Sequence, residues 1–214
     1  GCWIPTRAYQ FFIELRENLP EINNILLGCH CHNDLGLAVA NTLAAVQAGV
    51  DVVQCSINGL GERAGNASLE ETVMALRLNE KEFGRRISFK TELLTELSRL
   101  VEEYSGICVQ PNKAVVGKNV FRTAAGIHQD GLLKNPETYT LFPPQMVGAD
   151  GIEFVLTKHS GKNILRYKLN ELGLSMDDER FARFYQDYIR IADAKKIVSN
   201  EDLIVIAGEV LNLE

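Results

Sequence analysis

The stretch His30-Cys31-His32-Asn33-Asp34 follows a short apolar run, Ile-Leu-Leu-Gly-Cys at residues 25–29. An apolar run of this length predicts a buried β-strand. Because side chains alternate between the two faces of a strand, His30 and His32 share one face. The cysteines beside them, Cys29 and Cys31, share the opposite face. Two imidazoles about 7 Å apart along a strand can take adjacent positions on one metal ion, so the pattern indicates a metal site at the end of this strand.

Two other interpretations of the same stretch stay open. The histidines can be structural residues at the end of a strand, with their ring nitrogens hydrogen-bonded to the protein. The stretch can also be half of a Cys/His zinc knuckle. The alternation of side chains disfavours the knuckle, because it separates the sulfurs from the imidazoles and no second ligand pair has suitable spacing.

The surrounding sequence predicts two strand–loop–helix units in tandem. A helix over residues 35–48 follows the first strand, and a second buried strand follows over 50–57. A loop over 58–66 then leads to a helix over 69–78, and another helix, over 5–19, precedes the first strand. Tandem units of this kind build parallel sheets that bind ligands at the carboxyl ends of their strands.

Helices also dominate the remainder of the chain. Residues 91–105 have the apolar spacing of an amphipathic helix, and residues 106–161 are rich in glycine and proline and predict loops. Further helices are expected over 163–172, 177–194 and 201–210.

The loop after the second strand contains Gly-Leu-Gly-Glu-Arg-Ala-Gly-Asn at residues 59–66. A strand, a glycine-rich turn and a helix are a loose variant of a dinucleotide-binding motif. Alternatively, the turn delivers Glu62 and Asn66 toward a metal on the neighbouring strand. A third interpretation is a tight turn that contains glycines for backbone reasons alone.

The other two histidines lie in the loop-rich segment. His128 is two residues from Asp130, and a loop histidine near an acid suits a general base whose tautomer is held by a neighbour. Simple surface exposure is the alternative. We interpret His159 as part of a turn before a helix, with a structural role.

The composition narrows the classes of protein. The chain has 214 residues, of which 46% are hydrophobic and 23% charged, as in ordinary globular proteins. A formal charge of −6 disfavours nucleic acid as a partner and a basic membrane-binding surface. Five cysteines, an odd number, indicate reduced thiols and a cytoplasmic location. We see no membrane span or signal peptide, and the start at Gly1 suggests a fragment.

Three motifs together carry a resemblance to a known family. They are His30-x-His32-Asn33-Asp34, Gly59-x-Gly61-Glu62-Arg63-x-Gly65-Asn66 and Gly126-x-His128-Gln129-Asp130. In this order and spacing the chain resembles the 2-isopropylmalate synthase family. Homocitrate, citramalate and methylthioalkylmalate synthases are its relatives, and all are metal-dependent Claisen-condensing (β/α)8 enzymes.

The resemblance implies a fold and a division into parts. The fold class is α/β: the C-terminal portion of a (β/α)8 TIM barrel, followed by linker and helical subdomains. Residues 1–85 would form the last strands and helices of the barrel. Residues 86–161 would form a connecting helix and a linker subdomain, and residues 162–214 a helical subdomain. The resemblance further implies that the N-terminal half of the barrel is missing from this chain.

The resemblance also implies a chemistry. His30, His32 and Asn66 would bind a divalent ion (Zn, Mn or Mg). The family condenses acetyl-CoA with a 2-oxo acid, here in leucine biosynthesis, and usually as a homodimer. The implied catalytic residues are His128, as base, and Glu62, which helps to orient the metal ligands. We expect the chain alone to be inactive.

The sequence departs from the family's pattern at two places. Trp3 and Ile4 stand where the family often has a threonine that contacts the oxo acid, just before Pro5. A tyrosine that homocitrate synthases place after the histidine motif has no clear counterpart near residues 150–152. Homocitrate, citramalate and methylthioalkylmalate synthesis are close alternatives for the function. Two functions from other classes also remain: a non-catalytic dimerisation fragment and a nucleotide-binding oxidoreductase.

Overall fold

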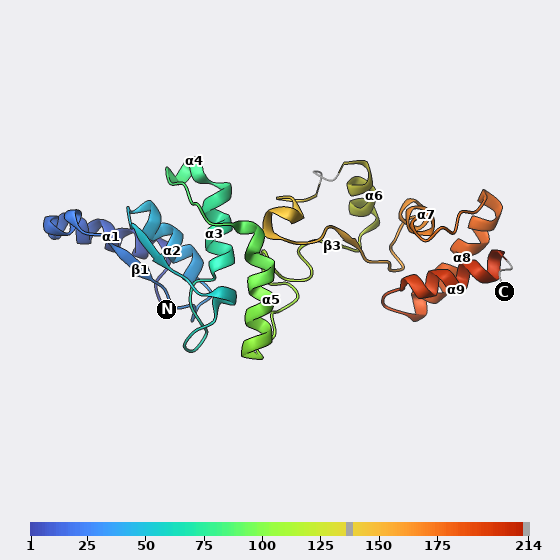
Figure 1. The fold of residues 1–214 in the computed structure, drawn as a ribbon, viewed down its shortest axis with the longest axis horizontal. Coiled ribbons are helices and arrows are strands. Elements are labelled where there is room, and N and C mark those ends of the chain that lie inside the picture. Colours follow the sequence, from blue (N-terminus) through green and yellow to red (C-terminus); the bar gives the residue numbers. More distant parts are fainter. Residues whose placement is uncertain (136–138, 212–214) are drawn as a thin grey trace. The chain divides into compact units, whose positions relative to one another are not determined.

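A computed structural model describes residues 1–135 and 139–211, and its chain forms two compact units (Figure 1). The first unit, which we call the N-terminal unit, contains residues 1–120 and 145–149. The second, the C-terminal unit, contains residues 121–144 and those from 150 onward. The division into three parts expected from the sequence stays a prediction.

The N-terminal unit begins with helix α1 (Pro5–Asn18), which packs on helix α2 (Ala38–Gln47). Pro5 stands in the first turn, where its missing N–H has no intrahelical partner to lose. A short 3-10 helix, η1 (Pro20–Asn24), separates α1 from the first strand. The helices predicted over 5–19 and 35–48 are confirmed, the second three residues shorter at its start.

The sheet of this unit is built as the tandem pattern predicts. Strand β1 (Gly28–His30) pairs in parallel with β2 (Val52–Gln54), and His30 lies opposite Gln54. Helix α2 joins the two strands. Helix α3 (Leu69–Leu78) follows the glycine-rich loop and packs on α2. The carboxyl ends of both strands therefore open into the loops that carry the sequence motifs.

The prediction that both strands are buried is wrong. Cys29 is buried, but Val52 is 42% exposed, and Ile25 and Leu26, which precede β1, are 61% and 77% exposed. The core around the sheet is small, since it joins Cys29, Ala45 and Val50 to a few half-buried apolar side chains. In the part of the chain that the structure describes, the sheet has two strands, so each has one unpaired edge.

The N-terminal unit also contains three short elements and one amphipathic helix. These are the 3-10 helix η2 (Ile57–Gly59), helix α4 (Glu80–Phe83), the 3-10 helix η3 (Thr91–Leu93) and helix α5 (Leu94–Ser105). Helix α5 packs on η2 and confirms the amphipathic helix predicted over 91–105. Gly106, with φ +68°, ends it in the left-handed conformation that glycine adopts easily.

The C-terminal unit is mainly helical. Strands β3 (Arg122–Thr123) and β4 (Glu153–Phe154) form a short parallel pair beside helix α6 (Gly126–Lys134). Helices α7 (Lys162–Glu171), α8 (Asp178–Ala194) and α9 (Asn200–Leu211) follow, and they confirm the three helices predicted there. Their buried residues form the main core of the unit, which includes Phe184, Tyr188 and Leu203.

Residues 106–161 are loop-rich, as predicted, but they also contain regular elements that the sequence did not predict. The segment contains α6, β3, β4 and a 3-10 helix, η5 (Pro144–Val147). Helix α6 contains two glycines, which lower its intrinsic helix propensity. The fully buried Gln129 ties it to the strands, because its amide nitrogen donates to Thr123 O at 3.0 Å and to Val155 O at 2.9 Å. These tertiary hydrogen bonds stabilise a helix that the local sequence does not indicate.

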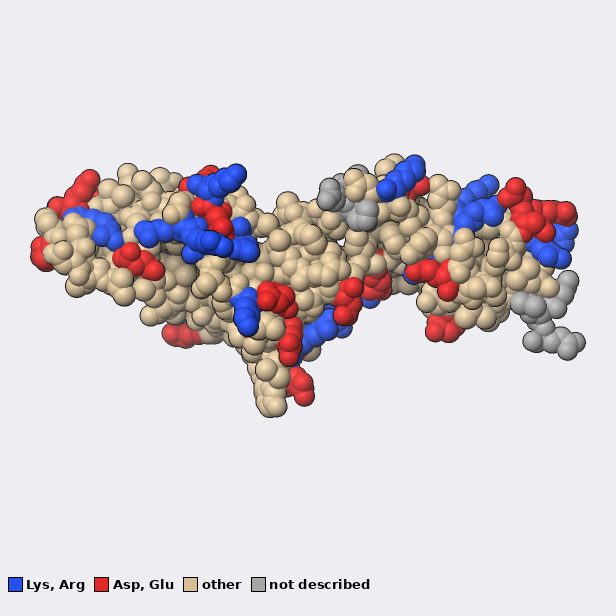
Figure 2. Space-filling model, turned by 45° about the horizontal axis from the view of Figure 1, so that its top comes forward, with Lys and Arg blue, Asp and Glu red and all other residues tan. Residues whose placement is uncertain are grey.

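Figure 2 shows acidic and basic side chains interspersed on the face that it draws. In residues 1–135 and 139–211, no helix is long and apolar enough to cross a membrane.

Candidate active site

Two histidines meet at the carboxyl end of β1. His30 is the last residue of the strand and is exposed, whereas His32 is half-buried. Their ring centroids lie 5.0 Å apart, with an angle of 78° between the ring planes. The alternation of the strand therefore brings both imidazoles to one place, as the sequence predicts.

The glycine-rich loop brings Asn66 to the same place. Asn66 pairs with His32 in an antiparallel bridge. On either side of the bridge, Asn33 N donates to Gly65 O at 2.9 Å, and Ala67 N donates to Cys31 O at 3.1 Å. Gly65 has φ +89°, and a Cβ there would lie 2.0 Å from the carbonyl oxygen of Gly59. The close return of the loop thus requires glycine at this position.

Two polar atoms at this bridge are buried and have no hydrogen-bond partner among the residues that the structure describes. They are Nδ1 of His32 and Oδ1 of Asn66. The other amide atom of Asn66, Nδ2, donates to Leu60 O at 3.4 Å and leaves Oδ1 free. A buried polar atom without a partner costs about 1–3 kcal/mol. Two such atoms on adjacent side chains fit a cation, and imidazole nitrogen with amide oxygen is a donor set that divalent metals accept.

The donors found there carry no formal negative charge. Within the described residues, no three side chains of His, Cys, Asp or Glu lie close enough together to hold a metal ion. His30, His32 and Asn66 are thus two imidazoles and an amide. A set without a carboxylate leaves the charge of a divalent ion uncompensated, so further ligands are needed for tight binding.

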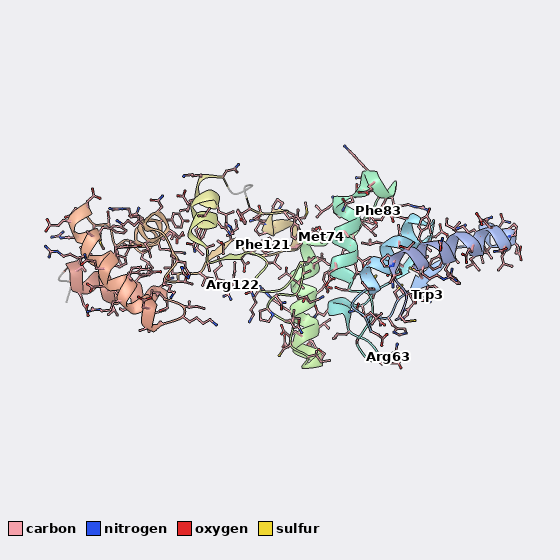
Figure 3. The ribbon with its side chains drawn as sticks, turned by 180° about the vertical axis from the view of Figure 1, so that it is seen from behind. Trp3, Arg63, Met74, Phe83, Phe121 and Arg122 are labelled. Atoms are coloured by element: carbon pink, nitrogen blue, oxygen red, sulfur yellow. The ribbon has the colours of Figure 1, made fainter. Side chains whose placement is uncertain are left out.

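A salt bridge joins the loop after β1 to the loop after β2. Arg63, labelled in Figure 3, donates to the Asp34 carboxylate from Nε at 2.7 Å and from Nη2 at 3.1 Å. The hydrogen bond from Arg63 is the main cause that lowers the pKa of Asp34 to about 2. Arg63 itself has φ +56°, a left-handed conformation that is uncommon for arginine. Its fork fixes the relative position of the two loops.

Glu62 forms an ion pair with its neighbour Arg63. Its carboxylate lies 3.2 Å from Nη1 of Arg63, and its side chain is 73% exposed. The catalytic role expected for Glu62 stays a prediction.

The two cysteines of the motif contact each other. A hydrogen bond with Cys31 is the main cause that raises the pKa of Cys29, and burial adds to it. The same hydrogen bond lowers the pKa of Cys31 to about 6. The two sulfurs therefore share a side, as the alternation predicts.

A pocket of about 260 Å³ lies between α1 and the end of β1. The histidines His30 and His32 form part of its wall, and the aromatic rings of Trp3, Phe11 and Phe12 form another part. Trp3 packs on Phe11 with ring centroids 5.0 Å apart. The pocket thus places an apolar wall beside the imidazoles. Trp3, one of the departures from the family's pattern, belongs to that wall.

The structure places His128 in the C-terminal unit, in the first turn of α6 and not in a loop. Its Nε2 atom is hydrogen-bonded to the hydroxyl of Tyr139, and the two ring centroids lie 3.8 Å apart. The acid expected beside it, Asp130, is engaged elsewhere: it accepts from Lys134 Nζ at 2.6 Å and from Asn163 Nδ2 at 2.7 Å. The hydrogen bond from Lys134 is the main cause that lowers the pKa of Asp130.

Sequence reasoning missed Tyr139, which follows His128 by eleven residues. A tyrosine was sought near residues 150–152, whereas the one that contacts the histidine lies before η5. No spacing rule links a residue of a helix to a residue beyond the helix's end, so the sequence contained no signal for the pair. His159 lies exposed in the turn before α7, as expected.

Two family models match this chain. The HMGL-like family, a TIM-barrel family, matches residues 1–101, and the homocitrate synthase post-HMGL domain-like family matches residues 115–196. The 2-isopropylmalate synthase of Syntrophus aciditrophicus is 46% identical over 211 residues, which are 99% of this chain and 41% of that protein. The 2-isopropylmalate synthase of Heliobacterium modesticaldum is 47% identical over the same shares of both chains. Over nearly its whole length, this chain is similar to 2-isopropylmalate synthases.

A third relative has the same name. The enzyme of that name from Pyrococcus furiosus is 43% identical over 211 residues, 99% of this chain and 42% of that protein. The chain spans about two fifths of the length of these relatives. Among solved structures, an HMG-CoA lyase from Acenitobacter baumannii, in complex with coenzyme A and 3-methylmalate, is 26% identical. It covers 54% of this chain and 38% of its own, with a TM-score of 0.43.

Proposed function

We propose that this chain is part of a metal-dependent acyltransferase that condenses acetyl-CoA with a 2-oxo acid, as a 2-isopropylmalate synthase does. The observation that carries the proposal is the pair of unpartnered buried atoms, His32 Nδ1 and Asn66 Oδ1, within the motifs of this family. The name of the relatives, 2-isopropylmalate synthase, supports this substrate class. Removing the acetyl unit from 2-isopropylmalate leaves a 2-oxo acid with an isopropyl group, and the function would then lie in leucine biosynthesis.

His30, His32 and Asn66 would hold the divalent ion, which could be Zn, Mn or Mg. When bound, such an ion polarises the carbonyl group of the oxo acid. Asp34 and Arg63 keep the two loops in register, so the three donors stay together. The apolar wall of Trp3, Phe11 and Phe12 beside the histidines suits the alkyl side chain of a branched oxo acid better than a second carboxylate.

His128 and Tyr139 would move the proton. The acetyl methyl group must lose a proton before it can attack a carbonyl, and a positioned base contributes about 10²–10⁴-fold to such a step. The contact between His128 Nε2 and the Tyr139 hydroxyl gives the pair one shared proton. The Tyr139 hydroxyl can orient the imidazole and receive or return that proton.

We also propose the fold of the whole region. Residues 1–85 would be the last part of a (β/α)8 barrel, residues 86–161 a connecting helix and linker subdomain, and residues 162–214 a helical subdomain. The exposed apolar residues before β1 support a missing barrel half on that side. The first family match ends at residue 101 and the second begins at residue 115, so the boundary between them lies inside the proposed connection. We propose a homodimer, and a cytoplasmic location stays a prediction.

The test uses the intact protein. We expect wild type to bind Mn²⁺ or Zn²⁺ in a titration and to release free coenzyme A from acetyl-CoA only when the branched 2-oxo acid is present. His30→Ala and His32→Ala should lose both metal and thiol release. His159→Ala, a histidine in an exposed turn, is the matched control and should keep both. Metal binding that is unchanged in the first two variants would place the ion elsewhere and contradict the proposal.

A further inference from the structure

The loop that carries Asn66 starts at a left-handed turn. Asn58 has φ +59° and Gly59 has φ +70°. This conformation costs most residues with a Cβ about 1–2 kcal/mol; asparagine tolerates it better, and further contacts hold Asn58 in it. The carbonyl oxygen of Gly59 accepts the backbone N–H of Asn66 at 2.9 Å. The turn therefore fixes where the backbone of Asn66 lies.

The buried carboxylate of Glu70 holds this turn by a hydrogen bond. Glu70, in the first turn of α3, is 1% exposed. Its Oε1 accepts the backbone N–H of Asn58 at 2.7 Å, and its Oε2 accepts the Ser68 hydroxyl at 2.5 Å. A buried charge is tolerated only when it is well hydrogen-bonded or paired. The ammonium of Lys113 lies nearby: it pairs with the Glu71 carboxylate at 2.7 Å and donates to Ser68 Oγ at 3.1 Å.

The side chain of Asn58 is held as well. Its Nδ2 donates to the carbonyl oxygen of Ser98 at 2.9 Å, and the Ser98 hydroxyl donates to its Oδ1 at 2.5 Å. Ser98 lies on α5 and is 3% exposed. Asn58 is therefore clamped between α3, through Glu70, and α5, through Ser98. Both sets of hydrogen bonds hold Asn58, the residue directly before Gly59.

We propose that Glu70 is a positioning residue for the metal centre. It acts through the hydrogen bond from Asn58 N to its Oε1, which keeps the turn left-handed, and through Gly59 O, which then holds Asn66. The inference rests on the proposed function, because it takes Asn66 as a metal ligand. Residues that orient metal ligands are worth about 10–100-fold in metal affinity or activity. A purely structural Glu70 would only stabilise the N-terminus of α3.

The experiment compares three variants of the intact protein. Glu70→Ala removes both hydrogen bonds, whereas Glu70→Gln keeps a side-chain oxygen that can accept from Asn58 N. Thr72→Val is the matched control for stability. Its buried hydroxyl donates to Ser68 O at 2.8 Å, in the same helical turn, and not to the loop. The measurements are the dissociation constant of Mn²⁺ by titration and the hydrogen-exchange rate of the Asn66 amide without metal.

Glu70→Ala should weaken Mn²⁺ binding about 10–100-fold and speed up exchange at Asn66. Glu70→Gln should stay close to wild type in both Mn²⁺ affinity and exchange at Asn66. Thr72→Val should do the same, even if its melting temperature falls as far as that of Glu70→Ala. If Glu70→Ala does not fold, Ser98→Ala replaces it. Loss of its single hydrogen bond should weaken binding roughly twofold to tenfold.

Two results would overturn the inference. One is a wild-type dissociation constant in Glu70→Ala, or in Ser98→Ala if that variant replaces it. The other is an equal loss of affinity in Glu70→Ala and Thr72→Val at the same melting temperature. Failure of the proposed function looks different, because wild type itself would then bind no metal through His30 and His32.

Discussion

The ion pair between Asp34 and Arg63 makes stability depend on pH. Because the pKa of Asp34 is lowered to about 2 in the folded chain, the contribution of the pair is complete above the unfolded-state pKa near 4. It is lost as the pH falls through about 2. We expect Arg63→Gln to melt below wild type at pH 6, and the difference to shrink between pH 4 and pH 2. The effect is small because both side chains are exposed.

Thermal melts at pH 6, 4 and 2 test this expectation, and an NMR titration of Asp34 gives its pKa directly. Arg7→Gln is the matched control, since Arg7 forms an exposed ion pair with Glu14 on α1. A melting difference that is the same at pH 6 and at pH 2 would contradict the prediction.

His128 and Tyr139 should matter for turnover and not for the metal. In the intact protein we expect His128→Ala to lower turnover about 10²–10⁴-fold, the usual worth of a positioned base. Tyr139→Phe should lower it less, because the imidazole remains. Metal content, measured by elemental analysis, should equal wild type in both. Loss of metal in His128→Ala would show that the residue has another role.

The sequence pattern did not determine which side chain contacts His128. Asp130 was expected beside it because the two residues are neighbours in the sequence. Once residues 126–134 form a helix, side chains two positions apart point in different directions. Asp130 therefore pairs with Lys134, four positions on, and His128 meets Tyr139 from outside the helix.

At the scale of elements, α6 depends on Gln129. The side chain donates to Thr123 O and Val155 O, and it is fully buried. Gln129→Leu would leave two carbonyl groups without their donor, so we expect the free energy of unfolding to fall by about 2–4 kcal/mol. Denaturant titration followed by circular dichroism measures the loss.

Gln10→Leu is the matched control for that substitution. Gln10 is exposed on α1, where the same change removes no buried hydrogen bond, so we expect little loss of stability. Equal unfolding midpoints for Gln129→Leu and Gln10→Leu would show that α6 does not depend on the buried amide.

At the scale of the whole molecule, the sheet of the N-terminal unit has exposed apolar side chains and unpaired edges. Ile25, Leu26 and Val52 are between 42% and 77% exposed. Exposed edges pair with other chains, and exposed apolar patches bind one another. We expect the chain, produced by itself, to form oligomers or to be poorly soluble, and Leu26→Lys to reduce this. Light scattering after size exclusion measures the mass, and a monomer with a sharp cooperative melt would refute the expectation.

The proposed dimer gives a test of how its active sites are shared. His30→Ala and His128→Ala would each inactivate the intact protein. If His128 acts across the interface, a mixed dimer of the two variants contains one site with both histidines intact, and up to about half of the activity returns. If His128 acts within its own subunit, both sites of the mixed dimer lack one histidine. No recovery in purified mixed dimers would therefore assign His128 to its own subunit.

The sequence by itself determined the local features. Period-two alternation brought His30 and His32 to one side, apolar periodicity gave the long helices, and the ordered motifs gave the family resemblance. These features depend on neighbours in the chain, so local physical rules suffice for them.

Only the tertiary structure decided which distant groups meet. It placed Tyr139 on His128 and Glu70 beside Asn58. It also decided burial, because whether Leu26 is covered depends on other strands and not on its own hydrophobicity. The glycine-rich helix α6 exists because Gln129 satisfies carbonyl groups of two strands. Contacts of this kind join residues far apart in the sequence, and no periodicity within one segment records them.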